Sequence, residues 1–166
     1  RMNEKINRMW KYDMLTQVLN RSGFFYCAET ILQKIKEEKS NAFIIFLDID
    51  GLKSVNDNLG HEIGDAFIAK IAGILKEVVP KDCLIMRYGG DEFVVFGSCK
   101  QAGRMQRIAE DIKAAIKTAD QKENRSYHLA ASLGCSLHKS YEMDNLNSLI
   151  ELADKKMYEE KKNKRR

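Results

Sequence analysis

The stretch RYGGDEFVVF, from Arg87 to Phe96, places two glycines and two acids between apolar runs rich in β-branched and aromatic residues. This pattern predicts two strands, Leu84 to Tyr88 and Phe93 to Phe96, joined by a tight turn. Glycine and aspartate favour turns for conformational reasons alone. The tetrapeptide Gly89-Gly90-Asp91-Glu92 is therefore either an ordinary hairpin turn or a turn that holds a ligand, and the rest of the chain must distinguish the two.

The segments around this hairpin are predicted from the spacing of apolar residues. Helical spacing predicts helices from Gly23 onward, over Gly64 to Val79, over Gln101 to Ala119 and over Leu146 to Lys162. Short apolar runs predict strands from Asn41 onward and over Tyr127 to Leu137. The central order, β-α-β-β-α-β, is the split βαβ arrangement of ferredoxin-like domains. It predicts an α+β fold with helices packed on one face of the sheet, and it places the end of the first strand beside the central hairpin.

The composition is that of a soluble globular domain. The chain has 166 residues, of which 44% are apolar and 31% charged, so it is long enough for one domain with a substantial core. The longest apolar run, Ala42 to Leu47, is too short to cross a bilayer, and the charged start RMNEKINRMWKYD is unlike a signal peptide. We therefore expect a cytoplasmic protein, or the cytoplasmic part of a membrane-anchored one.

The N-terminal residues are expected to connect the domain to an upstream region. Residues 1–12 predict a short polar helix, and the domain itself is expected over residues 13–166. The first residue is Arg rather than Met, which suggests a fragment of a longer polypeptide with a sensory or membrane region upstream.

Cysteine spacing and net charge argue against two further classes. Cys27, Cys83, Cys99 and Cys135 stand far apart without a CxxC pair, so reduced thiols fit better than a zinc site or disulfides. The net charge is +4, and much of it lies in the tail from Lys155 to Arg166. A solvated helix end explains this tail better than nucleic-acid binding, for which there is no other support.

Two acids end the first predicted strand. Asp48 and Asp50 alternate with Ile49, so an extended strand directs both carboxylates to one face. In a purely structural interpretation Asp50 starts a turn and Asp48 accepts a backbone N–H, and for an isolated pair this would be preferred. The hairpin, however, brings Asp91 and Glu92 alongside, and crowded carboxylates raise one another's pKa unless a cation lies between them. Such oxygen ligands suit Mg²⁺, which is held by one or two carboxylates together with substrate phosphates, as in phosphoryl transfer.

The segment after this strand, Gly51-LKSVNDNLGHEIGD, carries further groups suited to a nucleotide. Gly51 lets the backbone approach a phosphate, and Lys53 supplies a mobile positive charge, although an isolated lysine would be taken for a surface residue. Asn56 and Asp65 bracket a loop before a helix, where a turn amide and a helix-start acid are also common for structural reasons. In the functional interpretation Asp65 accepts hydrogen bonds from N1–H and the exocyclic amine of guanine, a pair of donors that adenine lacks.

Four segments in this order resemble the GGDEF domain of bacterial diguanylate cyclases. They are DMLTQVLNRSGF, DIDGLKSVNDNLGHEIGD, RYGGDEF and ADKKMYEEKK, and the resemblance covers the chain from Asp13 onward. It implies the nucleotide-cyclase palm variant of the predicted fold. It also implies that two GTP molecules are condensed into cyclic di-GMP with release of two pyrophosphates. Two domains face each other in this reaction, so that each 3′-hydroxyl attacks the other α-phosphate. The implied partners are GTP, Mg²⁺ or Mn²⁺, and a second copy of the domain.

The resemblance further implies roles for individual residues. Asp48 and Asp91 match metal-binding carboxylates, and the backbone carbonyl of Ile49 matches a further ligand. Glu92 matches the second acid of the signature, either as a ligand of a second metal or as a proton acceptor. The remaining positions match contacts to GTP: Gly51, Leu52 and Lys53 with the β- and γ-phosphates, Asn56 and Asp65 with guanine, Gly89 and Gly90 by close approach, and Lys161 and Arg165 with phosphate.

Three features depart from the family pattern. Lys164 stands where the family often has glycine, which makes Arg165 a weaker match than Lys161, and Leu52 replaces a more usual aromatic residue. The product-binding RxxD motif of many members would fall on Pro80-Lys81-Asp82-Cys83, where neither the arginine nor the aspartate is in place. We therefore expect no product inhibition through that site.

An active diguanylate cyclase is the main prediction. The alternative is a catalytically silent regulatory module that binds GTP, but such relatives usually lack a signature acid or glycine. A receptor for cyclic di-GMP is disfavoured because the RxxD motif is missing. A mixed purine dinucleotide product is disfavoured because Asp65 favours guanine.

Overall fold

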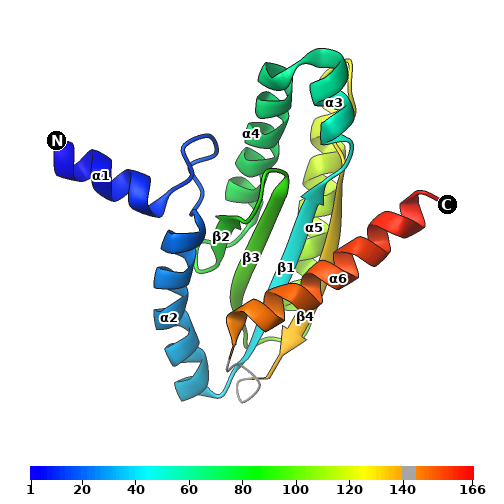
Figure 1. The fold of residues 1–166 in the computed structure, drawn as a ribbon. Coiled ribbons are helices and arrows are strands. Elements are labelled where there is room, and N and C mark those ends of the chain that lie inside the picture. The colour runs from blue at the N-terminus through cyan, green and yellow to red at the C-terminus, as the bar shows by residue number, and fades with distance from the viewer. Residues whose placement is uncertain (140–144) are drawn as a thin grey trace.

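A four-stranded antiparallel sheet forms the centre of the domain, in the order β2-β3-β1-β4. The computed structural model describes residues 1–139 and 145–166. In it the strands are β1 (Asn41–Ile49), β2 (Leu84–Arg87), β3 (Glu92–Cys99) and β4 (Ala131–His138). β2 and β3 form the predicted hairpin around the signature turn (Figure 1). The predicted α+β fold with a central hairpin is therefore confirmed.

Six helices accompany the sheet within the described ranges: α1 (Met2–Lys11), α2 (Arg21–Glu38), α3 (Leu52–Leu59), α4 (His61–Val78), α5 (Arg104–Lys122) and α6 (Leu146–Lys164). Four of them lie where the apolar spacing predicts a helix, α1 lies where a short polar helix was predicted, and α3 lies where we expected a loop. Leu52 and Val55, one turn apart, are its buried residues. Two apolar positions in an eight-residue polar segment are too few to reveal a helical period.

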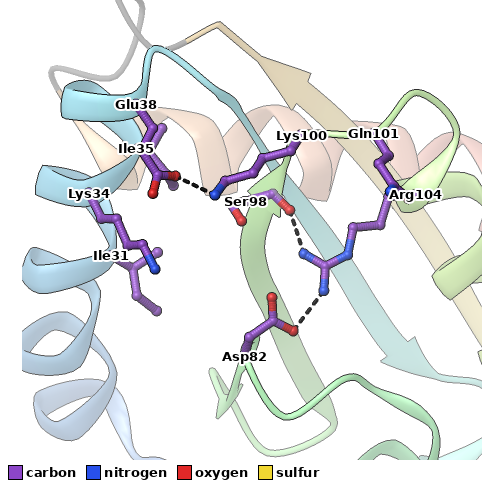
Figure 2. Close-up of a pocket in the computed structure, with 9 residues that line it drawn as sticks. All are labelled: Ile31, Lys34, Ile35, Glu38, Asp82, Ser98, Lys100, Gln101 and Arg104. Atoms are coloured by element: carbon purple, nitrogen blue, oxygen red, sulfur yellow. Dashed lines mark hydrogen bonds and ion pairs between the residues drawn. The ribbon is translucent and has the colours of Figure 1, made fainter.

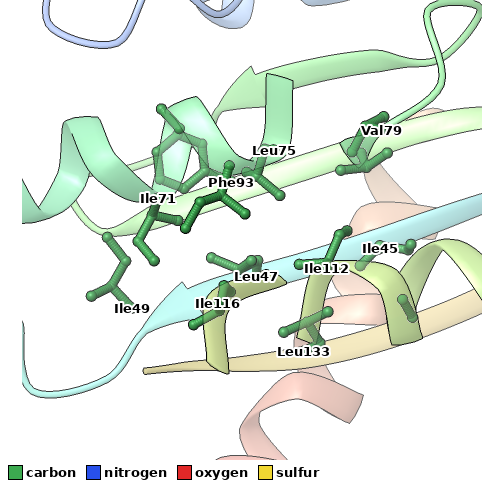
Figure 3. Close-up of a cluster of buried hydrophobic side chains, with 14 of the residues drawn as sticks. Ile45, Leu47, Ile49, Ile71, Leu75, Val79, Phe93, Ile112, Ile116 and Leu133 are labelled. Atoms are coloured by element: carbon green, nitrogen blue, oxygen red, sulfur yellow. The ribbon is translucent and has the colours of Figure 1, made fainter. Parts of the chain in front are cut away.

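Helices cover both faces of the sheet, which corrects the prediction of a single covered face. α4 and α5 pack over one face, where the cluster of Figure 3 lies, and α2 and α6 pack over the other. Alternate residues of β1 therefore belong to different cores: Ile45 and Leu47 to the first, Ile44 and Phe46 to the second. A strand buried on both faces has a continuous apolar run, as in Ala42 to Leu47, rather than an alternating pattern.

α1 lies outside both cores, because none of its residues is buried. The turn that follows it is nevertheless tied to the sheet. The Leu19 N–H donates to the Ile85 carbonyl at 3.1 Å, and the Arg87 N–H donates to the Leu19 carbonyl at 2.9 Å. The predicted N-terminal helix is thus present, while its role as a connector and the division of the chain after residue 12 stay predictions. None of the helices described has both the length and the apolar character needed to cross a membrane.

Candidate functional site

The signature turn lies against the end of β1, as predicted. Asp48 pairs with Glu92 in the register of β1 and β3, and the Ile49 N–H donates to the Asp91 carbonyl at 2.9 Å. The acids of the first strand and those of the turn therefore share one edge of the sheet, which we call the acidic edge (Asp48, Asp50, Asp91 and Glu92).

The carboxylate of Asp48 is largely buried and incompletely compensated. Its side chain is 15% exposed, and its Oδ1 atom accepts no hydrogen bond from the described residues. The interpretation that a backbone N–H satisfies this side chain is therefore wrong. Burial raises the pKa of Asp48 to about 7; the charge of Asp91 acts in the same direction, and Lys161 opposes it. A buried carboxylate with an unused oxygen and a like-charged neighbour is the environment that a bound cation relieves.

These donors fit a divalent cation with hard oxygen ligands. Asp48 and Asp91 each offer a carboxylate, and Ile49 follows Asp48 directly in the strand. No group of three or more His, Cys, Asp or Glu side chains surrounds a common metal position in residues 1–139 and 145–166. Side chains alone would therefore leave the coordination shell incomplete. Two carboxylates, with phosphate and water in the other positions, are the usual ligand set of Mg²⁺.

Glu92 lies close to the backbone of the signature turn. A Cβ atom at Gly89 would lie 2.2 Å from Glu92 Oε1, whereas a Cβ atom at Gly90 would meet open space. A side chain at Gly89 would therefore require the Glu92 carboxylate to move from its place beside the turn. Burial raises the pKa of Glu92, and the charges of Asp91 and Asp154 add to this effect. Glu92 is therefore an acid beside Asp91 whose raised pKa suits proton transfer.

Two arginines, which lie in the quoted motifs but received no role from the sequence, hold the turn in place. The Arg87 guanidinium donates to the Gly90 carbonyl at 2.8 Å and pairs with Asp13 at 3.3 Å. Arg21 donates to the Tyr88 carbonyl at 2.9 Å, and its guanidinium lies 4.0 Å from the centroid of the Tyr88 ring. Both contacts join the turn to the N-terminal part of the domain. The Arg87–Asp13 and Arg21–Tyr88 contacts link residues far apart in sequence, so no motif spacing indicates them.

α6 brings two lysines to the acidic edge. The Lys161 Nζ atom lies 3.2 Å from Asp48 Oδ2 and 3.8 Å from Asp50 Oδ1. Lys164, noted from the sequence only as a departure from the family, lies 3.0 Å from Asp50 Oδ2. Arg165 caps the helix end and is exposed, and no hydrogen bond or ion pair between described residues joins its side chain to the acidic edge. Residues three apart on a helix share a face, so the common position of the two lysines could have been inferred from the sequence.

The predicted phosphate segment forms the start of α3. Gly51 has a φ of 78°, a conformation that favours glycine, and Leu52 is buried beside it. No side chain caps the helix, so the backbone N–H groups of its first turn remain available to an anion. Lys53 is exposed in that turn. Because Gly51 directly follows Asp50, this predicted phosphate segment adjoins the acidic edge.

The two predicted guanine contacts lie at a separate corner, between α3 and α4. Asn56 packs so closely on α4 that a Cβ atom at Gly64 would lie 1.7 Å from its Oδ1 atom. Asp65 is the next residue of α4 and is exposed. The structure therefore brings Asn56 and Asp65 to one corner, and no hydrogen bond or ion pair between described residues joins this corner to the acidic edge.

A separate cavity lies near the other end of β3, which runs from Glu92 to Cys99. It has a volume of about 320 Å³ and is lined by residues from α2, the end of β3 and the start of α5 (Figure 2). Four of its charged side chains are already paired: Arg104 with Asp82, and Lys100 with Glu38, both at 2.7 Å. Asp82 belongs to the tetrapeptide at the RxxD position, and its carboxylate is thus engaged within the fold.

Comparison with known proteins agrees with this geometry. The family model "Diguanylate cyclase, GGDEF domain" matches residues 10–166. Diguanylate cyclase A of Treponema denticola is 29% identical over 98% of this chain and 45% of its own length. Diguanylate cyclase VdcA of Vibrio cholerae is 31% identical over 97% of this chain and 48% of its own length. The chain spans less than half the length of these curated relatives.

Solved structures show the same fold. The coiled coil and GGDEF domain of DgcB from Caulobacter crescentus, in complex with c-di-GMP, has a TM-score of 0.84 at 25% identity, over 98% of this chain and 86% of that one. The GGDEF domain of PA1120 from Pseudomonas aeruginosa has a TM-score of 0.80 at 28% identity, over 92% and 89%. With a family match that spans nearly every residue and a conserved architecture, the chain belongs to the GGDEF domain family of diguanylate cyclases.

Proposed function

We propose that this chain is the catalytic domain of a diguanylate cyclase, a nucleotidyltransferase that condenses two GTP molecules into cyclic di-GMP. In each step a 3′-oxygen bonds to the α-phosphorus of the other GTP, the bond from that phosphorus to pyrophosphate breaks, and the hydroxyl proton leaves. The observation that carries the proposal is the Asp48–Asp91 carboxylate pair, with the buried Asp48 Oδ1 atom unpaired. This pair lies directly beside the uncapped start of α3.

The residues of the acidic edge have different roles in phosphoryl transfer. Asp48, Asp91 and the Ile49 carbonyl would hold Mg²⁺ or Mn²⁺. When bound, such a metal neutralises charge that develops on the phosphate oxygens. Glu92, with its raised pKa, accepts the proton of the attacking hydroxyl or completes a second metal site.

Three parts of the fold bind GTP: the start of α3, the corner between α3 and α4, and the end of α6. The first turn of α3, with Gly51, Leu52 and Lys53, binds the β- and γ-phosphates. Lys161, and Arg165 at the end of α6, supply positive charge to the phosphates. At the corner of α3 and α4, Asp65 and Asn56 recognise the guanine edge. A base without the N1–H donor would leave the Asp65 carboxylate unpaired.

A second copy of the chain completes the reaction centre, because one chain holds one GTP. The apolar side chains of α1 support such pairing: Met2, Ile6 and Met9 are exposed and follow the alternating four- and three-residue spacing of a coiled coil. The DgcB structure is described as a coiled coil joined to a GGDEF domain. We therefore propose that α1 of two chains pair and bring the two acidic edges face to face.

Incubation with GTP and Mg²⁺, followed by chromatography, tests this function. We expect cyclic di-GMP and pyrophosphate from GTP and no cyclic dinucleotide from ATP. Binding of GTP without product, even at high chain concentration, would instead support the regulatory alternative.

Gly64→Ala should weaken GTP binding through Asn56. The added Cβ atom would overlap Asn56 Oδ1 and displace the side chain from its proposed place beside guanine. We expect the Kd for GTP, measured by calorimetry, to rise about tenfold. Gly73→Ala, in the same helix but with no atom within 4 Å of the added Cβ, is the control. Equal affinity in both variants would exclude Asn56 from guanine recognition.

Cyclic di-GMP is not expected to inhibit through the tetrapeptide Pro80-Lys81-Asp82-Cys83. Asp82 is already paired with Arg104, and the Lys81 ammonium donates to the Lys76 carbonyl. Initial rates should therefore be unchanged by micromolar cyclic di-GMP. Micromolar binding of the product that disappears in the Lys81→Ala/Asp82→Ala double variant would contradict this expectation.

A further inference from the structure

The side chain of Lys164 binds the ends of two strands. Its ammonium lies 3.0 Å from Asp50 Oδ2 and donates to the Ala131 carbonyl at 2.7 Å. The side chain is 46% exposed, so polar contacts rather than burial hold it there. Asp50 directly follows β1, and Ala131 begins β4. One ammonium therefore fastens the last turn of α6 to both strands.

Asp50 is shared by three groups. The Ser132 hydroxyl donates to its Oδ1 atom at 2.8 Å, Lys164 binds Oδ2, and Lys161 lies 3.8 Å from Oδ1. Lys161 is closer to Asp48, at 3.2 Å. Lys161 thus pairs mainly with Asp48, and Lys164 pairs with Asp50. If Lys164 lost its charge, Asp50 would attract Lys161 more strongly and draw it away from Asp48.

Asp50 also fixes the bend that opens α3. Its N–H donates to the Ala130 carbonyl at 2.9 Å, and the next residue is Gly51, whose left-handed conformation starts the helix. A contact to the Asp50 carboxylate therefore acts on the position of the α3 start, which is the proposed phosphate site. The C-terminal end of α6 and the bend that opens α3 are therefore joined by the contact between Lys164 and Asp50.

We propose that Lys164 is a positioning residue, which holds Lys161 over Asp48 and fixes the end of α6 against the bend that opens α3. The proposal rests on the proposed binding of GTP at the same edge. The adjacent Lys162 shows how an ordinary lysine of this turn behaves. Its ammonium lies 4.7 Å from the centroid of the Tyr158 ring, a contact within α6 itself.

Steady-state kinetics of Lys164→Met, Lys164→Arg and the matched control Lys162→Met test the role. Lys164→Met should raise the KM for GTP about tenfold while kcat falls much less, because a group that orients the binding site is lost rather than a group in the reaction. Lys164→Arg keeps the charge and should recover most of the affinity. Lys162→Met removes the same charge from the same turn and should match the wild type. In an Asp50→Asn background the effect of Lys164→Met should shrink, because the two side chains act as a pair.

Amide hydrogen exchange gives a readout that needs no nucleotide. Exchange in Lys164→Met should be faster than in the wild type at residues 49–52 and 158–164, and it should be unchanged in Lys162→Met. If exchange rises as expected but the wild type makes no cyclic di-GMP, the proposed function fails and the positioning role stands. If the wild type makes product while Lys164→Met leaves both KM and exchange unchanged, the positioning role is overturned and the proposed function stands.

Discussion

Asp91→Ala and Asp48→Asn are expected to lower cyclic di-GMP production at least about a thousandfold, since each removes a charge that organises the reacting phosphates. Asp48 and Asp91 supply the two proposed metal-binding carboxylates of the acidic edge, and no group of three or more His, Cys, Asp or Glu side chains in the described ranges surrounds a metal position. Turnover should be followed by chromatography at saturating GTP and Mg²⁺. Wild-type rates in either variant would show that the carboxylate pair is not the metal site.

Asp48→Asn should also make the metal-free protein more stable at pH 8, so that loss of activity cannot be ascribed to unfolding. Burial and the charge of Asp91 raise the pKa of Asp48 to about 7, well above the value of about 4 in an unfolded chain. Ionisation therefore costs more in the folded state, and stability falls as the pH rises from about 4 to about 7 and stays low above that. Asparagine carries no charge and avoids this cost.

Thermal unfolding measures this gain. We expect the Tm of metal-free Asp48→Asn at pH 8 to exceed that of the wild type by about 3 °C, which corresponds to roughly 1 kcal/mol. The difference should shrink as the pH falls through 4 and disappear near about pH 3, where Asp48 is protonated in both states. A lower Tm for the variant at pH 8 would contradict the account of Asp48 as a destabilised carboxylate.

Gly134→Ala should be strongly destabilising, because β4 and α6 touch at this glycine. A Cβ atom there would lie 2.1 Å from the Met157 nitrogen and 2.2 Å from the Ala153 carbonyl oxygen. Both are backbone atoms of α6 and cannot move without displacing the helix from the sheet. We expect a loss of about 3 kcal/mol in the free energy of unfolding, and a fall in Tm of about 9 °C. Activity should fall as well, since α6 carries Lys161.

Gly73→Ala is the matched control for this substitution. Gly73 lies inside α4, and an added Cβ atom meets nothing within 4 Å. Alanine in a helix interior is favoured over glycine by roughly 0.5–1 kcal/mol, so this variant should unfold at a slightly higher temperature than the wild type. Equal stability of the two alanine variants would mean that α6 does not pack on β4 as described.

The sequence predicted the hairpin and the end of β1 well, because both rest on local patterns. Gly89 and Gly90 between β-rich runs define the turn, and period-2 alternation puts Asp48 and Asp50 on one face. The split βαβ order then places the end of the first strand beside the hairpin, and the observed pairing of Asp48 with Glu92 confirms this placement. These elements were enough to bring the carboxylates together without any structural information.

Other features depend on long-range packing and were missed or wrong. The second face of the sheet is covered because α2 and α6 lie opposite α4 and α5. The spacing of apolar residues within one helix does not reveal on which face of the sheet that helix packs. α3 is stabilised by two buried side chains, Leu52 and Val55, and by the glycine that starts it. The contacts of Arg87 with Asp13 and of Arg21 with Tyr88 join residues more than sixty positions apart in sequence, as the separations of 74 and 67 show. Asn56 was expected on a loop and lies instead within α3, where it packs against Gly64.

Product stoichiometry at varied chain concentration tests the central claim most directly. Wild-type protein incubated with GTP and Mg²⁺ should release two pyrophosphates for each cyclic di-GMP. The rate per chain should rise with chain concentration until pairing is complete, because two acidic edges must meet. Asp91→Ala, handled identically, provides the background. Bound GTP with no cyclic di-GMP at any chain concentration would contradict the assignment of this chain as a diguanylate cyclase.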